Sequence, residues 1–271
     1  MIIDAHTHCF PDTLAERAIS KLATTSSIQP ATDGTLSGLL KKMDEDGITQ
    51  SLVCHIATNL RQQASVNRFA VEINGYAGGR ICSLGSVHPD SENAEETVAE
   101  LKAAGLFGIK LHPDYMQTMV DDMRFDSIFG ACEGLGMPVV IHAGFDPVSP
   151  EVIHASPERI ARVLDRHPKL QLVAAHMGAC RLSDETERYL LGRDVYIDTS
   201  ISLLDLDPER ATRMLTQHDS NKILFASDSP WASAQDTFQY LKSLELGAEL
   251  EEKILYKNAR RLFGLPVPES A

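Results

Sequence analysis

The chain has 271 residues, of which 43% are hydrophobic and 23% are charged, and this composition predicts a folded, water-soluble protein with a sizeable core. Its 25 Lys and Arg against 38 Asp and Glu give a formal net charge of −13, which argues against nucleic acid and membrane surfaces as partners. The five cysteines form no CxxC pair, and no signal peptide or bilayer-spanning apolar run is evident. We therefore expect a cytoplasmic protein with reduced thiols that acts on a small molecule.

Eight short apolar runs recur along the chain and predict buried strands. They are Met1–Ala5, Ser51–Ile56, Arg80–Val87, Gly108–Leu111, Pro138–Ile141, Leu170–Ala175, Val195–Thr199 and Ile223–Ala226. Segments with helical spacing lie between them, including Leu36–Asp46, Ala94–Ala104, Pro157–Arg166 and Glu249–Phe263. Eight strand–helix units of about 34 residues each predict one (β/α)8 TIM barrel domain over residues 1–271. An open doubly wound sheet would show the same alternation.

Several predicted helix ends carry local signals. Gly47 and Gly264 follow helical segments and predict their C-terminal stops, because glycine adopts the left-handed conformation that ends many helices. Ser156 before Pro157 predicts an N-cap with proline at the first helical position. The polar segment Thr24–Thr35 predicts a long loop near the first strand.

The strongest functional signal is a set of polar residues at the predicted strand ends: His6, His8, Lys110, His112, His142, His176 and Asp228. Side chains two apart in a strand point the same way, so His6 and His8 project together. Because catalytic groups of a (β/α)8 barrel lie at the carboxyl ends of its strands, these distant residues would meet at one mouth. Three imidazoles and a carboxylate there suit Zn²⁺ or another divalent first-row ion.

Five of these segments, in chain order, resemble motifs of the amidohydrolase superfamily: Asp4-Ala5-His6-Thr7-His8, Gly108-Ile109-Lys110-Leu111-His112-Pro113, Ile141-His142-Ala143-Gly144, Ala175-His176-Met177-Gly178 and Ser227-Asp228-Ser229-Pro230. The nearest branch is the amidohydrolase-2 group, which includes aminocarboxymuconate-semialdehyde decarboxylase. Lys257–Phe263 is similar to the last helix of that group. The resemblance covers essentially the whole chain and implies a metal-dependent hydrolase barrel.

The resemblance also implies roles for individual residues. A divalent ion would be bound by His6, His8, His142 and Asp228, with His176 as the acid or base beside it and Asp228 as a second proton acceptor. We expect Zn²⁺, with Mn²⁺ and Fe²⁺ as alternatives. The number of ions, one or two, stays open because of Lys110. In other branches a lysine at this position is carboxylated and bridges two metals, whereas Lys110 lies in a setting more like that of the mononuclear branch, near the substrate.

The residues predicted to bind substrate lie at or just after the strand ends and are Lys110, His112, Tyr115, Arg181 and Trp231. Arg181 carries the planar fork that suits a substrate carboxylate. The loops Thr24–Thr35 and Phe145–Ala155 contain no sequence motif that identifies the substrate.

Each candidate also has a structural interpretation. Asp228 suits an N-cap, His142 a core histidine and Lys110 a solvated lysine. His176 is an acid or base, a ligand, or a structural partner of Asp198.

Other polar residues of the strands receive secondary roles. We predict packing or loop roles for His55 and His88, and orienting contacts to the ligand histidines from Asp4 and Asp198.

The predicted function is hydrolysis of a small polar ester, lactone or amide through a metal-activated water. A non-oxidative decarboxylase of a small carboxylic acid on the same scaffold is the main alternative. A TatD-like nuclease is disfavoured by the acidic charge and by Lys110 in the fourth strand. A barrel that binds metal without turnover is the non-catalytic alternative. Homo-oligomer formation stays open.

Overall fold

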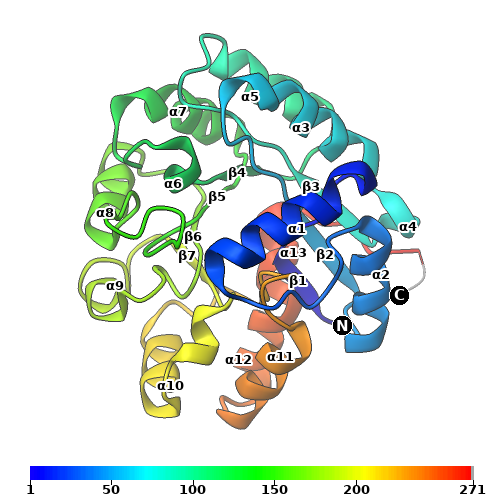
Figure 1. The fold of residues 1–271 in the computed structure, drawn as a ribbon. Helices are drawn as coiled ribbons and strands as arrows, with labels where there is room; N and C mark the ends of the chain where they lie inside the picture. Colours follow the sequence, from blue (N-terminus) through cyan, green and yellow to red (C-terminus); the bar gives the residue numbers. More distant parts are fainter. Residues whose placement is uncertain (270–271) are drawn as a thin grey trace.

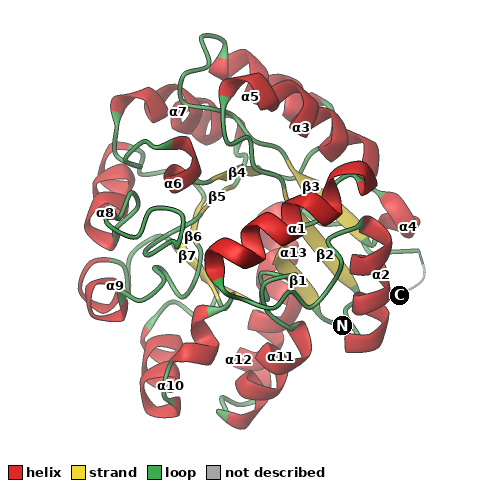
Figure 2. Ribbon diagram, viewed as in Figure 1, coloured by secondary structure: helices red, strands yellow, loops and turns green. Residues whose placement is uncertain are grey.

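The computed structural model describes residues 1–269, in which eight parallel strands are surrounded by helices (Figures 1 and 2). The strands are β1 (Ile3–Thr7), β2 (Gln50–Cys54), β3 (Ile81–Leu84), β4 (Ile109–Leu111), β5 (Val139–Ile141), β6 (Leu172–Ala174), β7 (Tyr196–Asp198) and β8 (Ile223–Leu224). Every strand residue is buried, as the near-continuous apolar runs predicted. The observed strands are shorter than most of the predicted runs, which lose residues at one or both ends.

The larger helices are α1 (Asp12–Ser26), α2 (Leu36–Asp46), α3 (Leu60–Ile73), α5 (Ala94–Ala103), α7 (Asp126–Leu135), α8 (Pro157–Arg166), α10 (Pro208–Gln217) and α11 (Ala234–Ser243). Shorter turns are α4 (Tyr76–Gly79), α6 (Pro113–Met116), η1 (Met123–Phe125), α9 (Ser183–Tyr189), η2 (Ser202–Asp205), α12 (Ala248–Glu252), η3 (Lys253–Lys257) and α13 (Asn258–Phe263). The predicted end signals are confirmed: Gly47 and Gly264 have φ of 69° and 63°, and the Ser156 side chain accepts a hydrogen bond from the backbone N–H of Arg159.

The strands close into a barrel through backbone hydrogen bonds between two parallel ladders, β1–β2–β3 and β4–β5–β6–β7–β8. Between β3 and β4, the Lys110 N–H donates to the Gly85 carbonyl at 2.7 Å. Between β1 and β8, the Ala5 N–H donates to the Phe225 carbonyl at 2.9 Å, and the Asp228 N–H donates to the His6 carbonyl at 2.8 Å. The predicted (β/α)8 TIM barrel is therefore confirmed, and the open sheet is excluded.

The interior of the barrel is filled by residues from several strands, which form one hydrophobic cluster that includes Ile3, Leu52, Leu84, Val140, Val173 and Leu224. Lys110 pairs in register with Val140, so its side chain enters this interior and is 1% exposed. No helix of the described residues is long and apolar enough to cross a membrane. All five cysteines lie within the described residues and are free thiols.

The loop prediction for Thr24–Thr35 is wrong at its start, because α1 continues to Ser26. The hydroxyls of Thr24, Thr25 and Ser26 donate to carbonyls four residues earlier, which satisfies backbone acceptors in the last turn of the helix. The polar residues that suggest a loop are therefore part of the helix.

The predicted helix Glu249–Phe263 is also irregular, because its middle turn, η3, is a π-helix. The carbonyl of Ile254 accepts a hydrogen bond from the Phe225 N–H just after β8, at 2.9 Å. The π turn thus supplies a backbone acceptor that ties the last helical run to the last strand.

Asn258 provides a test of how strongly this last helical run supports β8. Its fully buried side-chain amide donates to the carbonyls of Ser220, at 2.9 Å, and Ile223, at 2.8 Å. We expect Asn258→Ala to lower the free energy of unfolding by about 1–3 kcal/mol, because it leaves two carbonyls without their partner. Urea unfolding measures the effect, with the exposed Asn221→Ala as the control. Equal losses in the two variants would contradict this role.

Candidate metal centre and active site

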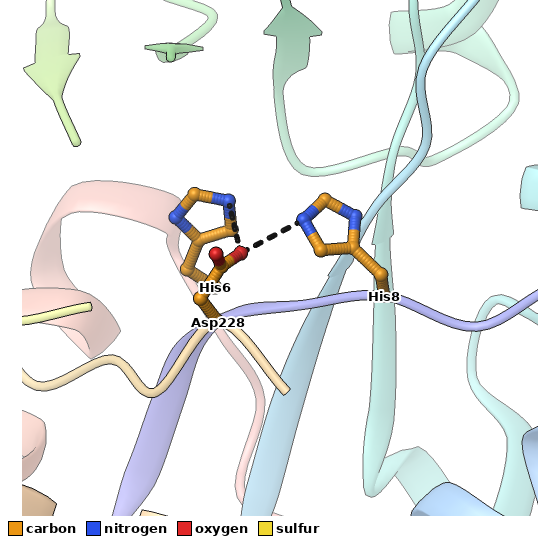
Figure 3. A group of neighbouring side chains, drawn as sticks. All are labelled: His6, His8 and Asp228. Carbon is orange, nitrogen blue, oxygen red and sulfur yellow. Dashed lines mark hydrogen bonds and ion pairs between the residues drawn. The ribbon is translucent and has the colours of Figure 1, made fainter. Parts of the chain in front are cut away.

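His6, His8 and Asp228 converge where the first and last strands meet (Figure 3). His6 Nε2 lies 3.4 Å and His8 Nε2 lies 3.0 Å from the same Asp228 oxygen. The backbone fixes this approach, since the His8 N–H also donates to the Ser229 carbonyl at 2.6 Å. Asp228 adopts a φ of 69°, a left-handed conformation that costs energy for a residue other than glycine and that occurs often at functional sites.

The ring of His6 is oriented by Asp198 at the end of β7. Its Nδ1 donates to Asp198 Oδ2 at 3.1 Å, so in the neutral ring Nε2 keeps its lone pair. Burial, together with the nearby Lys110 charge, lowers the pKa of His6 to about 4, so the ring is neutral at pH 7. Lys110 Nζ donates to that Nε2 at 2.9 Å, and burial lowers the pKa of Lys110 as well.

His8 is oriented in the same way by β2, because its Nδ1 donates to the Cys54 carbonyl at 2.8 Å. In its neutral form, His8 therefore also directs a lone pair at Asp228. Burial acts to raise the pKa of Asp228, but the neighbouring rings of His6, His8 and His176 act to lower it and together hold this pKa well below its usual range.

The donor set of His6, His8 and Asp228 fits a divalent first-row ion. Two imidazole nitrogens and a carboxylate oxygen are donors that such an ion prefers, and on binding it would replace Lys110 Nζ as the partner of His6 Nε2. These three residues would hold the ion. Their oriented Nδ1 atoms are the arrangement expected of metal-binding histidines.

His176, after β6, belongs to the same hydrogen-bond network through Asp198. Its backbone N–H donates to Asp198 Oδ1 at 2.9 Å, and its Nδ1 donates to the Ser200 hydroxyl at 2.9 Å. Ser200 donates in turn to Asp198 Oδ1. His176 Nε2 is therefore an acceptor, and it faces His142 Nδ1 at 2.9 Å.

His142 lies beside the three-residue ligand group, in a second group of possible ligands with His112 and Asp146. Its ring stacks on His112 with centroids 4.2 Å apart, and its Nε2 lies 3.6 Å from Asp146 Oδ2. Its role as a ligand of the ion at His6 and His8 stays a prediction.

The predicted substrate-binding residues fall into two sets. Lys110 and His112 lie among the buried histidines, and the Tyr115 ring packs on His112 with centroids 4.1 Å apart. Arg181 is exposed and stacks its guanidinium 4.3 Å from the centre of the Phe145 ring. Trp231 is half-buried in the turn after Asp228, whose carbonyl accepts from its N–H at 2.8 Å. Substrate contact by all five stays a prediction.

Asp4 contacts the backbone of His6 rather than its ring. Its carboxylate accepts from the Ser227 N–H at 2.9 Å, the Ser227 hydroxyl at 2.5 Å and the His6 N–H at 3.3 Å. Burial raises the pKa of Asp4 to about 7. This residue therefore braces the junction of β1 with the segment after β8.

His55 and His88 make the packing and loop contacts that we predicted for them. The buried His55 ring meets Phe69 edge-on, with centroids 5.4 Å apart. His88 Nδ1 accepts from the backbone N–H of Asp90 at 3.2 Å.

Sequence reasoning missed three polar residues of this region, Ser200, Asp114 and Asp146. Ser200 and Asp114 each lie two residues after a candidate residue, Asp198 and His112, and Asp146 lies four after His142. The available signal was the local spacing of polar residues beyond a strand end. It is weak, because loops are rich in such residues.

Comparison with known proteins now places the chain in a family. The amidohydrolase family model matches residues 3–265. The chain belongs to the amidohydrolase family. It is therefore an enzyme of a family that includes hydrolases and decarboxylases and depends on metal. No curated protein sequence matches the chain significantly.

Solved structures share the fold at low identity. The 5-carboxyvanillate decarboxylase of Novosphingobium aromaticivorans, whose structure holds manganese, is 16% identical, with a TM-score of 0.71 over 98% of this chain and 97% of that one. The 2,6-dihydroxybenzoate decarboxylase of Rhizobium is 18% identical, with a TM-score of 0.72 over 97% and 98%. A putative 2-pyrone-4,6-dicarboxylic acid hydrolase of Pseudomonas putida is 18% identical, with a TM-score of 0.64 over 97% of both chains.

We expect Asp198→Asn to weaken Zn²⁺ binding by about 10- to 100-fold, because the amide loses the charge that orients His6 and increases its basicity. Competition with a chromophoric chelator at pH 7.5 measures this affinity. The control is Asp194→Asn, which removes an exposed partner of Lys222 and should leave the affinity unchanged. Wild-type affinity in Asp198→Asn would contradict the orienting role.

His55 predicts an acid sensitivity of the fold. Burial, together with the nearby His8, lowers the pKa of the His55 ring from its ordinary value of 6.5 to about 3, so the native state favours the neutral ring. The contribution of the neutral His55 ring to the free energy of unfolding is complete above about pH 6.5 and is lost as the pH falls toward 3. Between pH 7 and pH 5, we expect the free energy of unfolding of His55→Leu to fall by about 2 kcal/mol less than that of wild type. Urea unfolding at the two pH values measures this difference, and identical losses would contradict it.

Proposed function

We propose that this enzyme hydrolyses a small polar ester, lactone or amide with a divalent ion held by His6, His8 and Asp228. The observation that carries the proposal is the convergence of two oriented imidazole nitrogens and a carboxylate on one point, with His176 linked to them through Asp198. A bound divalent ion would lower the pKa of water to about 7 and polarise the carbonyl under attack.

Within this proposal, His176 is the proton acceptor. Burial lowers its pKa, so it is neutral at pH 7, and its Nδ1 proton is committed to Ser200. Its Nε2 is therefore the basic atom. Asp198, reached through Ser200, would stabilise the imidazolium that forms, by the same logic as the carboxylate of a Ser-His-Asp triad. Asp228 is a weaker base, because its pKa is held far below neutrality.

Decarboxylation is the second candidate, and the similar structures of two decarboxylases of carboxylated aromatic acids favour it. In that reaction His176, after taking up a proton on Nε2 from solvent, would deliver this proton to the carbon that loses carbon dioxide. The aromatic rings of His112 and Tyr115, in contact at a tilt of 55°, are side chains of the kind that an aromatic or unsaturated acid packs against. A TatD-like nuclease and a metal-binding barrel without turnover have no such support.

The remaining assignments belong to the same proposal. We favour Zn²⁺, with Mn²⁺ and Fe²⁺ as alternatives, a cytoplasmic location, and a small-molecule substrate in place of nucleic acid or membrane. Carboxylation of Lys110 and homo-oligomer formation are open parts of this proposal.

His176→Ala separates the base from the ligands. We expect kcat/KM to fall by about 100-fold or more while the metal content stays at the wild-type level, because the base is lost and the three ligands are kept. Metal-loaded protein is assayed on esters, lactones and carboxylated dienes, with product analysis and carbon dioxide release.

The control for this test is His167→Gln, which alters a histidine bound to Asp126 at the end of α8. Undiminished turnover in His176→Ala would refute the base assignment. Carbon dioxide release without cleavage of any ester, lactone or amide would replace hydrolysis by decarboxylation.

A further inference from the structure

The turn that follows β7 has a strained backbone and lies beside the proposed base, His176. Ile201, at its centre, adopts a φ of 50° and a ψ of −62°, and the Ser202 N–H donates to the Ser200 carbonyl two residues earlier. These features define a γ-turn with a positive central φ, which is a rare and strained conformation. A β-branched residue is especially unfavourable there, because its side chain crowds the backbone.

Hydrophobic packing does not explain why isoleucine occupies this position. Ile201 is half-buried, and none of the hydrophobic clusters formed by the described residues includes it. Glycine would adopt this φ without strain, but it would also give the turn more conformational freedom. Backbone strain of this kind often occurs at functional sites, so we examined what the turn holds in place.

The turn directs both oxygen atoms of Ser200 at one ring nitrogen of His176. The Ser200 hydroxyl lies 2.9 Å and the Ser200 carbonyl lies 3.4 Å from His176 Nδ1. Ser200 and His176 are 0% and 3% exposed, so bulk water does not compete for these contacts. The γ-turn hydrogen bond orients the carbonyl, and the Ser200 N–H, which donates to Asp198 Oδ1 at 3.1 Å, anchors the other side of the residue.

Asp198 determines the direction of the hydrogen bond between Ser200 and His176. Burial acts to raise the pKa of Asp198, but the hydrogen bond from His6 and the nearby rings of His6 and His176 lower it to about 2. Asp198 is therefore a carboxylate at neutral pH and only accepts hydrogen bonds. The single proton of the Ser200 hydroxyl is donated to Asp198 Oδ1, so the hydroxyl oxygen accepts from His176 Nδ1.

The segment that carries His176 is strained as well. His176 and Met177 have φ values of 63° and 55°, which are unfavourable for residues other than glycine. The same Asp198 ties them to β7, because its carboxylate accepts from the His176 N–H at 2.9 Å and its carbonyl accepts from the Met177 N–H at 2.7 Å. Both sides of the hydrogen bond between His176 and Ser200 thus lie on strained backbone.

We infer that Ser200 is a positioning residue, which keeps the ring proton of His176 on Nδ1, and that the strained turn at Ile201 holds Ser200 in place for this task. The inference rests on the proposed function, in which His176 Nε2 is the basic atom. A neutral histidine carries its proton on either nitrogen, and hydrogen bonding decides which. Without Ser200, a share of the molecules would carry the proton on Nε2 and would be unable to accept another there.

¹⁵N NMR of full-length, histidine-labelled, Zn²⁺-loaded protein tests the role of Ser200, with the His176 signals identified by their absence in His176→Gln. In wild type, Nδ1 should resonate in the protonated range and Nε2 in the unprotonated range. In Ser200→Ala the two shifts should move toward each other, because the two tautomers mix. The control is Ser83→Ala, which removes a buried hydroxyl that has no hydrogen-bond partner among the described residues and should leave both shifts unchanged.

The NMR result and the turnover separate this inference from the proposed function. Wild-type shifts in Ser200→Ala would overturn the inference, whatever the turnover. Mixed shifts in Ser200→Ala, together with a wild type that cleaves no ester, lactone or amide, would support the inference and count against the proposed function. If wild type is active, Ser200→Ala should lower kcat by about 10-fold at unchanged KM and metal content, because fewer molecules hold the productive tautomer. A change in KM alone would overturn the positioning role.

A pair of variants at Ile201 tests the strained turn. Ile201→Ala shortens the side chain but keeps the Cβ atom that causes the strain, whereas Ile201→Gly removes it. Where φ is negative, alanine is more stable than glycine, and where φ is positive the order is reversed. We therefore expect a higher urea midpoint for Ile201→Gly than for Ile201→Ala. The His176 shifts should be more mixed in the glycine variant, because its turn holds Ser200 less firmly.

The control position is Ile28, which is half-buried and is not among the residues of positive φ. There the alanine variant should have the higher urea midpoint. The same order at Ile201 as at Ile28 would overturn the role of the strained turn. A glycine variant of Ile201 that is the more stable one but keeps the wild-type His176 shifts would overturn it too, because the turn would then only connect β7 to η2.

Discussion

The junction of the first and last strands is the constraint on which the active site depends. The hydrogen bonds that close the barrel there involve the backbone of His6, His8 and Asp228 themselves. Asp4 strengthens the same junction by binding both the N–H and the hydroxyl of Ser227. Barrel closure thus holds residues from the two ends of the chain in one geometry. The ligand set of His6, His8 and Asp228 is complete only when β8 is correctly paired with β1.

A single buried carboxylate, that of Asp198, organises the two halves of the site. One of its oxygens accepts from the ring of His6, and the other accepts from Ser200 and from the backbone of His176. Its hydrogen bond from the ring proton of His6 leaves Nε2 of that ring basic, and its hydrogen bond from Ser200 fixes the tautomer of His176 and, through His176, that of His142. Burial lowers the pKa values of these three histidines, so the rings are neutral. The tautomer of each ring, rather than a positive charge, therefore determines which nitrogen can accept a proton or bind a metal.

Much of this architecture follows from sequence patterns, because periodic burial and strand-end polar residues are local consequences of a barrel. The bounds of α2 and α8 match the predicted segments, and His6, His8 and Asp228 meet as barrel closure requires. The end of α1 was missed because Thr24–Ser26 satisfy helix carbonyls with their hydroxyls, which their polarity alone does not reveal. The grouping of Asp114 and Asp146 with His112 depends on how two loops fold back over the mouth, and such tertiary geometry has no short-range signature.

Asp114 also connects the mouth to the segment between β5 and α8. Its Oδ1 accepts from the Ser149 hydroxyl at 2.5 Å and from His154 Nδ1 at 2.9 Å. These two hydrogen bonds hold both ends of that segment against the turn after β4. Two neighbouring loops therefore behave as one module. A chimera that takes the 145–155 segment from a relative therefore also needs a residue on α6 that replaces the contacts of Asp114. Substrate selectivity should change more easily by substitution of residues between Ser149 and His154 than by a change in the length of the segment.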